Sequence, residues 1–174
     1  MANDSVLELQ GVGKTYGSTR VLGPIGFSVQ KGELLTLLGP SGCGKTTTLH
    51  IIAGLTQPSE GAVVMGGRDI TDLEPPHRDM GLVFQNYALF SNKTALQNIA
   101  ERLLVVDRWP KEKAYQRARE ILDRIGLADK ADAYPASMSG GQQQRVGIGR
   151  AMATGAEVIL FDEPTSSLDP EWVE

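Results

Sequence analysis

The chain reads Gly39-Pro40-Ser41-Gly42-Cys43-Gly44-Lys45-Thr46 directly after an apolar run, Leu34 to Leu38. This stretch fits the pattern G-x-x-x-x-G-K-[ST] of a phosphate-binding loop, which is specific when a strand precedes it and a helix follows it. We expect the apolar run to be a strand covered on both faces of a mostly parallel sheet, and Thr46 to Ala53 to form the helix, ended by Gly54. The stretch therefore predicts an α/β fold built around a phosphate-binding loop.

The residue types in this loop predict its ligands. Gly42 and Gly44 allow the backbone to wrap a β-phosphate, and Lys45 places a positive charge between the β- and γ-phosphates. The hydroxyl of Thr46 is a ligand for Mg²⁺. The loop by itself predicts a bound nucleotide with its metal ion, but not the kind of nucleotide machine.

A second glycine-rich turn reads Ser139-Gly140-Gly141-Gln142-Gln143-Gln144-Arg145. The two glycines permit backbone angles at which amide groups converge on an anion, and Ser139 adds a hydroxyl donor. A helix expected from Gln142 to Ala153 points its positive end at the same place. The turn thus predicts an anion site that faces outward; taken alone, it is equally typical of an ordinary helix start.

Two carboxylates follow the apolar stretch Val158 to Phe161, which predicts a buried parallel strand. Asp162 and Glu163 then lie at the carboxyl edge of the sheet, where open α/β sheets bind ligands. We expect Asp162 to hold Mg²⁺ and Glu163 to orient and partly deprotonate the attacking water; a helix cap or a solvated acidic turn is the less favoured alternative for the pair. Gln85 follows another short strand, Met80 to Phe84, and could reach the metal and the water, although a glutamine there is often only a surface residue.

The rest of the chain predicts a small β part and a helical insert. Alternation at Val6 to Leu9 and at Phe27 to Val29 indicates short strands of an antiparallel N-terminal sheet. Ala62 to Met65 predicts a further short apolar strand. From Thr94 to about Ile125 the apolar residues keep a 3.6-residue spacing; they are Ala114, Ala118, Ile121, Leu122 and Ile125. We predict one domain, with residues 1–86 and 154–174 as the nucleotide-binding core and residues 87–153 as a helical subdomain.

Composition limits the function. A chain of 174 residues with 41% hydrophobic residues and a net charge of −4 is typical of one globular domain without a general nucleic-acid surface. Its single cysteine, Cys43, excludes an internal disulfide and favours a reducing, intracellular compartment. No apolar run approaches the ~20 residues of a membrane helix, and the start lacks the regions of a signal peptide. We expect the protein to dock at a membrane if it works there.

Taken in order, the phosphate loop, a glutamine after a strand, the Ser-Gly-Gly-Gln turn, the Asp-Glu pair and Ser167-Leu168-Asp169 resemble the nucleotide-binding subunit of an ABC transporter. The resemblance covers Val6 to Glu174 and implies a P-loop NTPase core of the RecA-like kind, with a mostly parallel sheet. It implies an ATPase that uses ATP and Mg²⁺, pairs head to tail with a second ATPase subunit, and drives transmembrane permease subunits from the cytoplasmic face of the membrane, with a solute-binding protein as a further partner.

The resemblance also implies a role for each matching position. Catalytic roles fall on Glu163, Lys45 and Gln85, and the metal ligands are Thr46, Gln85 and Asp162. Ser167-Leu168-Asp169 becomes the D-loop, although alone it could be only an Asp-Pro turn. The nucleotide-binding residues are Tyr16, which stacks on adenine, the loop residues Gly39, Pro40, Ser41, Gly42, Cys43, Gly44, Lys45, Thr46 and Thr47, and the signature residues Ser139, Gly140, Gly141 and Gln142.

Two departures from the family pattern stand out. Met138 replaces the usual leucine before the signature, a mild apolar change. The family's switch histidine, about 30 residues beyond the D-loop, lies past Glu174, so we expect a fragment of a longer chain, truncated at the C-terminus and marginally stable alone. Residues 66–90 look most like importers of polyamines, sugars, phosphonates or inorganic anions, whereas the end at residues 169–173 looks more like importers of polar amino acids. A soluble ABC-type ATPase without a permease and a non-hydrolysing ATP-binding module remain alternatives.

Overall fold

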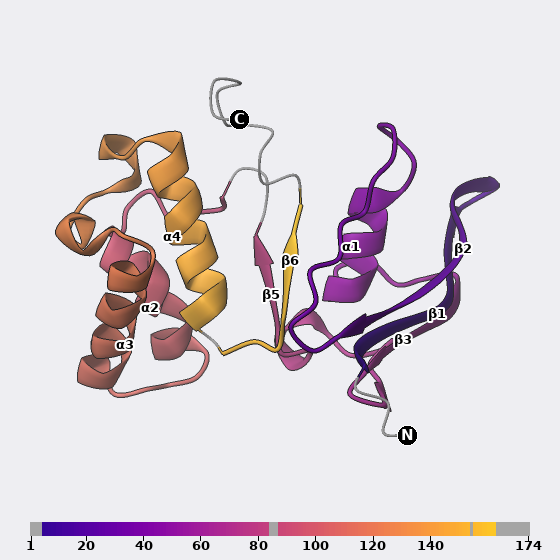
Figure 1. The fold of residues 1–174 in the computed structure, drawn as a ribbon, viewed down its shortest axis with the longest axis horizontal. Coiled ribbons are helices and arrows are strands. Elements are labelled where there is room, and N and C mark those ends of the chain that lie inside the picture. Colours follow the sequence, from indigo (N-terminus) through magenta and orange to yellow (C-terminus); the bar gives the residue numbers. More distant parts are fainter. Residues whose placement is uncertain (1–4, 84–86, 154, 163–174) are drawn as a thin grey trace. The chain divides into compact units, whose positions relative to one another are not determined.

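The structure, a computed structural model, describes residues 5–83, 87–153 and 155–162. The chain divides into two compact units, Met1–Met80 and Gly81–Glu174. The first unit holds an antiparallel sheet with one helix, and the second holds a helical cluster and two paired strands (Figure 1). Each unit is described separately below.

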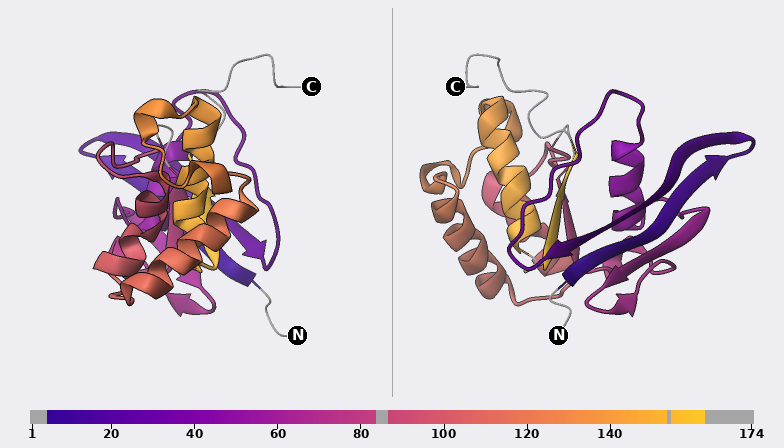
Figure 2. Two further views of the ribbon diagram at one scale, coloured as in Figure 1. Left: turned by 90° about the vertical axis from the view of Figure 1, so that its left-hand side faces the viewer. Right: turned by 45° about the vertical axis from the view of Figure 1, so that its right-hand side comes forward.

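Four antiparallel strands form the sheet of the first unit in the order β2-β1-β3-β4. Strands β1 (Ser5–Tyr16) and β2 (Thr19–Gln30) make a long hairpin (Figure 2), and β3 (Glu60–Met65) pairs with the other edge of β1. The short β4 (Arg68–Asp69) completes the sheet. The predicted antiparallel N-terminal sheet is therefore confirmed, but its first two strands are 12 residues long rather than short. Several register shifts interrupt the pairing of β1 with β2, which explains why strict alternation in the sequence covers only parts of them.

Helix α1 (Lys45–Ala53) follows the phosphate loop, as predicted. Its buried residues are Thr48, Ile51, Ile52 and Ala53. Gly54 ends it with a left-handed backbone (φ 79°), and its N–H donates to the carbonyls of the last turn. A single 3₁₀ turn, η1 (Pro75–His77), precedes the second unit.

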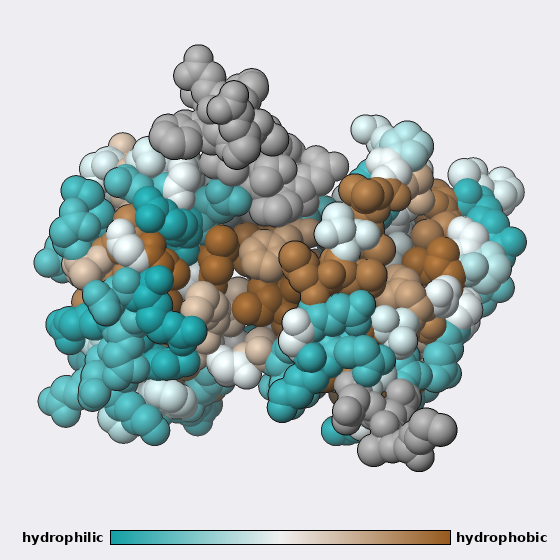
Figure 3. Space-filling model, viewed as in Figure 1, coloured by the Kyte–Doolittle hydropathy of each residue, from teal (hydrophilic) through white to brown (hydrophobic). Residues whose placement is uncertain are grey.

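The predicted strand at residues 34–38 is wrong for this structure. Leu34 and Leu38 are 86% and 88% exposed, and these residues have no strand conformation. A strand needs a hydrogen-bonded neighbour, and the four strands of the first unit pair only among themselves. Apolar character alone predicted burial but supplied no partner for the backbone. Apolar atoms reach the surface of the first unit in the space-filling view (Figure 3).

Three helices pack together in the second unit: α2 (Ala95–Val105), α3 (Lys111–Arg124) and α4 (Gly140–Ala153). The 3.6-residue spacing predicted for α3 is confirmed, since Ala114, Ala118, Ile121 and Leu122 are fully buried. Two 3₁₀ turns, η2 (Ala128–Lys130) and η3 (Pro135–Ser137), link α3 to α4. A capping box begins α2, because Thr94 Oγ1 accepts from Gln97 N–H and Gln97 Oε1 accepts from Thr94 N–H.

Strands β5 (Met80–Val83) and β6 (Val158–Phe161) lie side by side and point the same way (Figure 1). The sequence predicted a short apolar strand at residues 80–84 and a buried parallel strand at residues 158–161; residue 84 lies outside the described residues. Gly81 lies against Ala151 of α4, so closely that a Cβ at position 81 would be 2.8 Å from the Ala151 Cβ. Among the described residues, no helix has the length and apolar character to cross a membrane.

Candidate nucleotide-binding site

The phosphate loop is a compact turn stabilised by its own lysine. Lys45 Nζ donates to the carbonyls of Gly39 and Pro40 at 2.8 and 3.0 Å, and it lies 3.8 Å from Cys43 Sγ. Gly42 and Gly44 adopt left-handed backbone angles (φ 82° and 96°), which other residues reach only with strain. The lysine ammonium therefore lies across the loop that the sequence predicts to hold phosphates.

The loop continues directly into α1, whose first residues are Lys45 and Thr46. The first turn of this helix has no acidic residue, and Gly44 at its N-cap offers no side-chain cap. Backbone N–H groups at such an end, together with the helix dipole, favour an anion. Thr46 is exposed and Thr47 is half-buried. Since the donor set is one ammonium, exposed backbone amides and a hydroxyl, the residues fit a phosphate chain, and the Thr46 oxygen fits a hard cation such as Mg²⁺.

Strand β2 fixes the position of the loop. A Cβ at Gly44 would lie 2.8 Å from Leu22 Cδ1 and 3.2 Å from the carbonyl oxygen of Val21. Thr48 Oγ1 donates back to the Gly44 carbonyl at 2.9 Å. Gly44 is thus required both for its backbone angle and for the close approach of β2.

Tyr16, the residue expected to stack on adenine, is the last residue of β1 and pairs with Thr19 across the hairpin turn. Its side chain is 54% exposed, and Lys14 Nζ lies 4.8 Å from the centre of its ring. The ring is therefore accessible on the same hairpin whose second strand contacts Gly44.

The signature turn begins α4 with a reciprocal cap. Ser139 Oγ accepts from Gln142 N–H at 3.3 Å, and Gln142 Oε1 accepts from Ser139 N–H at 2.9 Å. This is a capping box, so the ordinary helix-start interpretation holds in this structure. It does not exclude the anion site, because a serine hydroxyl that accepts one hydrogen bond can still donate its own hydrogen. Gln143 supports the turn by donating to the carbonyls of Pro135 and Met138 at 3.0 and 3.1 Å.

The prediction that Gly140 and Gly141 adopt special backbone angles is wrong. Both are residues of α4, and neither has a positive φ. What distinguishes them is open space: a Cβ at Gly141 would meet nothing within 4 Å, and one at Gly140 would only approach Tyr87 Oη at 3.9 Å. Met138 is 6% exposed within the helical core, so its apolar side chain fills the position as predicted.

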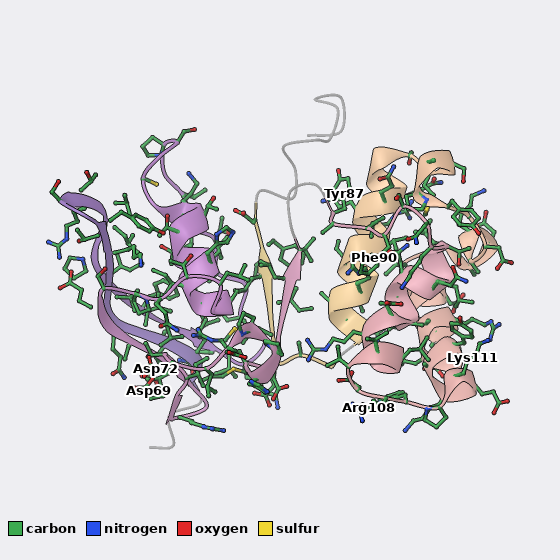
Figure 4. All side chains as sticks on the ribbon, turned by 180° about the vertical axis from the view of Figure 1, so that it is seen from behind. Asp69, Asp72, Tyr87, Phe90, Arg108 and Lys111 are labelled. Carbon is green, nitrogen blue, oxygen red and sulfur yellow. The ribbon has the colours of Figure 1, made fainter. Side chains whose placement is uncertain are left out.

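Helix α4 also holds the segment that begins at Tyr87. Tyr87 is buried, and both Tyr87 and Ala88 have left-handed backbones (φ 58° and 45°). Arg150 donates to the Ala88 carbonyl, and its guanidinium carbon lies 4.9 Å from the centre of the Phe90 ring. Figure 4 shows Tyr87 and Phe90 beside α4. Burial lowers the pKa of the Arg150 guanidinium, while the charge of Glu101 opposes this shift.

The buried Asn98 fixes the same segment from α2. Asn98 Oδ1 accepts from Phe90 N–H at 2.8 Å, and Asn98 Nδ2 donates to the carbonyls of Phe90 and Lys93 at 3.1 and 3.0 Å. Lys93 in turn lies 4.7 Å from the centre of the Phe90 ring and pairs with Glu101.

Of the two acidic residues after β6, only Asp162 lies within the described residues. Asp162 is half-buried directly after β6, and its N–H donates to the Val83 carbonyl at 3.0 Å. Its carboxylate thus lies at the carboxyl end of the two-stranded sheet, where we predicted it. Glu163, Gln85 and Ser167-Leu168-Asp169 lie outside the described residues, so their predicted roles stay predictions.

Sequence reasoning missed three polar residues that the structure takes out of solvent: Arg78 and Asn98, which are buried, and Arg150, which is half-buried. Apolar patterning gives no signal for them, because each is a polar residue at a position where the pattern expects surface. The signal available was local composition: Asn98 lies one turn after the Thr94 cap, and Arg78 directly follows the proline-rich segment Glu74 to His77.

Comparison with known proteins finds one family model and relatives that are all named as ATP-binding proteins of transport systems. Residues 22–166 match the model of the family described as ABC transporter. The chain is 45% identical over 172 residues to the glutamine transport ATP-binding protein GlnQ of Bacillus subtilis, covering 97% of this chain and 71% of that protein. It is 48% identical to the sulfate/thiosulfate import ATP-binding protein CysA 2 of Chromobacterium violaceum (94% and 44% covered). It is 46% identical to the Fe(3+) ions import ATP-binding protein FbpC of Brucella abortus (92% and 45% covered), so it spans less than half of the latter two proteins.

Proposed function

Because this chain belongs to the ABC transporter family, we propose that it is the ATP-binding part of a protein that hydrolyses ATP to drive import of a solute through a membrane permease. The observation that carries the proposal is the phosphate loop: Lys45 bridges the loop at the N-terminal end of α1, with Gly42 and Gly44 in left-handed conformations. Relatives named as import ATP-binding proteins support the direction of transport.

In this proposal each predicted site residue, in the phosphate loop or outside it, has a defined role. Lys45 and the first amides of α1 bind the triphosphate and orient it, and Tyr16 stacks on the adenine. Thr46 and Asp162, with Gln85, hold Mg²⁺, which neutralises charge on the phosphates. Glu163 accepts a proton from the attacking water.

Assembly completes the site. Ser139, Gly140, Gly141 and Gln142 form the start of α4, and a Cβ at Gly141 would meet nothing within 4 Å; this open start suits capping of ATP bound to a second ATPase subunit. The partners are then that second subunit, permease subunits and a solute-binding protein, and the location is the cytoplasmic face of the membrane. Since the three relatives are named for glutamine, sulfate or thiosulfate, and Fe(3+), the cargo is left open.

ATP turnover by the full-length protein tests the proposal. Replacing Lys45 with alanine removes the positive charge at the phosphates, so we expect turnover to fall at least roughly a hundredfold. Lys31→Ala, which changes an exposed lysine in the turn after β2, is the matched control and keeps wild-type turnover. Binding of ATP by the wild-type protein without any phosphate release would favour the non-hydrolysing module instead, and equal turnover in Lys45→Ala and wild type would refute the assignment.

A further inference from the structure

Arg78 is a buried cation that the proposed chemistry does not use. Its side chain is 1% exposed, although arginine is rarely buried without partners. In the sequence, Arg78 directly follows η1 and precedes the start of β5 by two residues. The N–H groups of a buried guanidinium need hydrogen-bond acceptors, and the acceptors of Arg78 indicate which parts of the fold it stabilises.

The guanidinium caps the C-terminal end of α1. Arg78 Nη1 donates to the carbonyls of Ile51 and Ile52 at 2.8 and 2.9 Å. These carbonyls belong to the last turn, where the N–H donors of a continuing helix are missing; the Ile51 carbonyl also accepts from Gly54 N–H at 3.1 Å. A positive charge there also lies at the negative end of the helix dipole.

The same side chain connects α1 to the turn that follows β4. Arg78 Nε donates to the Leu73 carbonyl at 2.8 Å, and Nη2 donates to the Thr71 carbonyl at 2.6 Å. Burial lowers the pKa of the guanidinium, whereas the charges of Asp72 and Asp69 oppose the shift. These two carboxylates come from the same region of the first unit (Figure 4).

Gly54 makes room for this contact. A Cβ at Gly54 would lie 2.5 Å from Arg78 Nε and 2.9 Å from its Cζ. Gly54 is also left-handed (φ 79°), so both its conformation and its lack of a side chain serve the end of α1. The C-terminal end of α1 can therefore accept the Arg78 guanidinium only because residue 54 is glycine.

Both ends of α1 are therefore anchored within the first unit. Contacts of Gly44 with Val21 and Leu22 hold the phosphate-loop end, and Arg78 holds the other. The helix has nine residues, about 14 Å at 1.5 Å per residue, and behaves as a rigid rod. A shift at its C-terminal end consequently moves Lys45 and Thr46 at its start.

We propose that Arg78 is a positioning residue for the phosphate loop, which it holds in place for the triphosphate by fixing the far end of α1 to the turn at Thr71 and Leu73. The inference rests on the proposed nucleotide-binding function. It predicts that loss of the Arg78 contacts weakens nucleotide binding more than the chemical step, because the reacting groups themselves remain.

The test compares Arg78→Lys and Arg78→Met with Arg68→Met in the full-length protein. Arg68 is an exposed arginine on β4 of the same unit and serves as the matched control. We expect a roughly tenfold rise in the KM for MgATP in Arg78→Met with a smaller change in kcat, partial recovery in Arg78→Lys, and no change in Arg68→Met. A folded Arg78→Met protein with the wild-type KM would overturn the proposal.

Hydrogen exchange of the backbone amides separates positioning from general destabilisation and covers the case in which Arg78→Met does not fold. In Arg78→Lys, we expect faster exchange at residues 44–54 than in wild type, with unchanged exchange in the β1–β2 hairpin. A uniform increase over the whole first unit, or no increase at residues 44–54, would contradict the inference. This readout needs no ATP turnover, so its failure is distinct from failure of the proposed function.

Discussion

At the scale of single residues, the Ser139 hydroxyl has one observed role and one proposed role. Its oxygen caps α4 by accepting from Gln142 N–H, and its hydrogen is the proposed donor to a phosphate. A substitution that keeps the cap but adds a negative charge can separate the two roles, because aspartate is as good an N-cap as serine.

We expect Ser139→Asp to keep the unfolding free energy within about 0.5 kcal/mol of wild type. Turnover of ATP should nevertheless fall roughly a hundredfold, since the carboxylate repels the triphosphate. Ser139→Ala, which removes the cap, should lose about 1 kcal/mol in denaturant unfolding. Wild-type turnover in Ser139→Asp would show that Ser139 is a cap and nothing more.

Asp69 gives a prediction about acid stability. The hydroxyl and the N–H of Thr71 both donate to Asp69 Oδ1, at 2.6 and 2.8 Å. These hydrogen bonds lower the pKa of Asp69 in the folded protein, with a small contribution from Arg78. A lowered folded pKa contributes stability above the unfolded value of about 4, and this stability is lost as the pH falls through the folded pKa.

Replacing Asp69 with asparagine removes this titration, so stability should fall less steeply with acid than in wild type. Urea unfolding at a series of pH values from neutral to below about 4 measures the slope. Asp132→Asn, which changes an exposed carboxylate in the second unit, is the control and should keep the wild-type slope. Identical slopes for Asp69→Asn and wild type would contradict the assigned cause.

At the scale of elements, α4 packs through small residues rather than large ones. Its buried residues are Val146, Gly147, Gly149, Ala151 and Ala153. A Cβ at Gly149 would lie 3.0 Å from Ile99 Cδ1, 3.1 Å from Ile121 Cγ2 and 3.2 Å from Ile125 Cδ1. The signature helix therefore lies close to both α2 and α3, and its position depends on this glycine.

Gly149→Val should lower the unfolding free energy by about 1–3 kcal/mol, because the added methyl groups overpack the contact with α2 and α3. Gly141→Val makes the same change on the same helix at a position where a Cβ meets nothing within 4 Å, so it is the matched control. Denaturant unfolding followed by circular dichroism measures both variants. Equal stabilities would mean that α4 can shift to accommodate the side chain.

At the scale of the whole molecule, the proposed function requires two ATPase subunits. Replacing Glu163 with glutamine in the full-length protein should abolish turnover while ATP-bound dimers accumulate, because water is no longer activated but ATP still binds. Light scattering should then report a mass twice that of the monomer with MgATP, and the monomer mass when Lys45→Ala is added to the same protein. A monomer at every ATP concentration would contradict head-to-tail pairing, and unchanged turnover would refute Glu163 as the base.

Short-range patterns in the sequence determined much of this protein. The phosphate loop, the ends of α1, the face of α3 and the strand before Asp162 depend on residues within one or two turns of each other, so spacing alone predicts them. Helix α4 begins two residues earlier than predicted, at Gly140, because the Ser139 cap includes the glycines in the helix.

Only the tertiary structure decided which residues meet over long distances. The guanidinium of Arg78 reaches carbonyls 26 and 27 residues away, and Arg150 reaches Ala88 across 62 residues. The apolar run at residues 34–38 shows the converse, since it predicted a buried strand but has no strand partner in the first unit. Local sequence fixes backbone conformation and the apolar face of an element, but hydrogen-bond partners and burial depend on what the rest of the chain brings beside it.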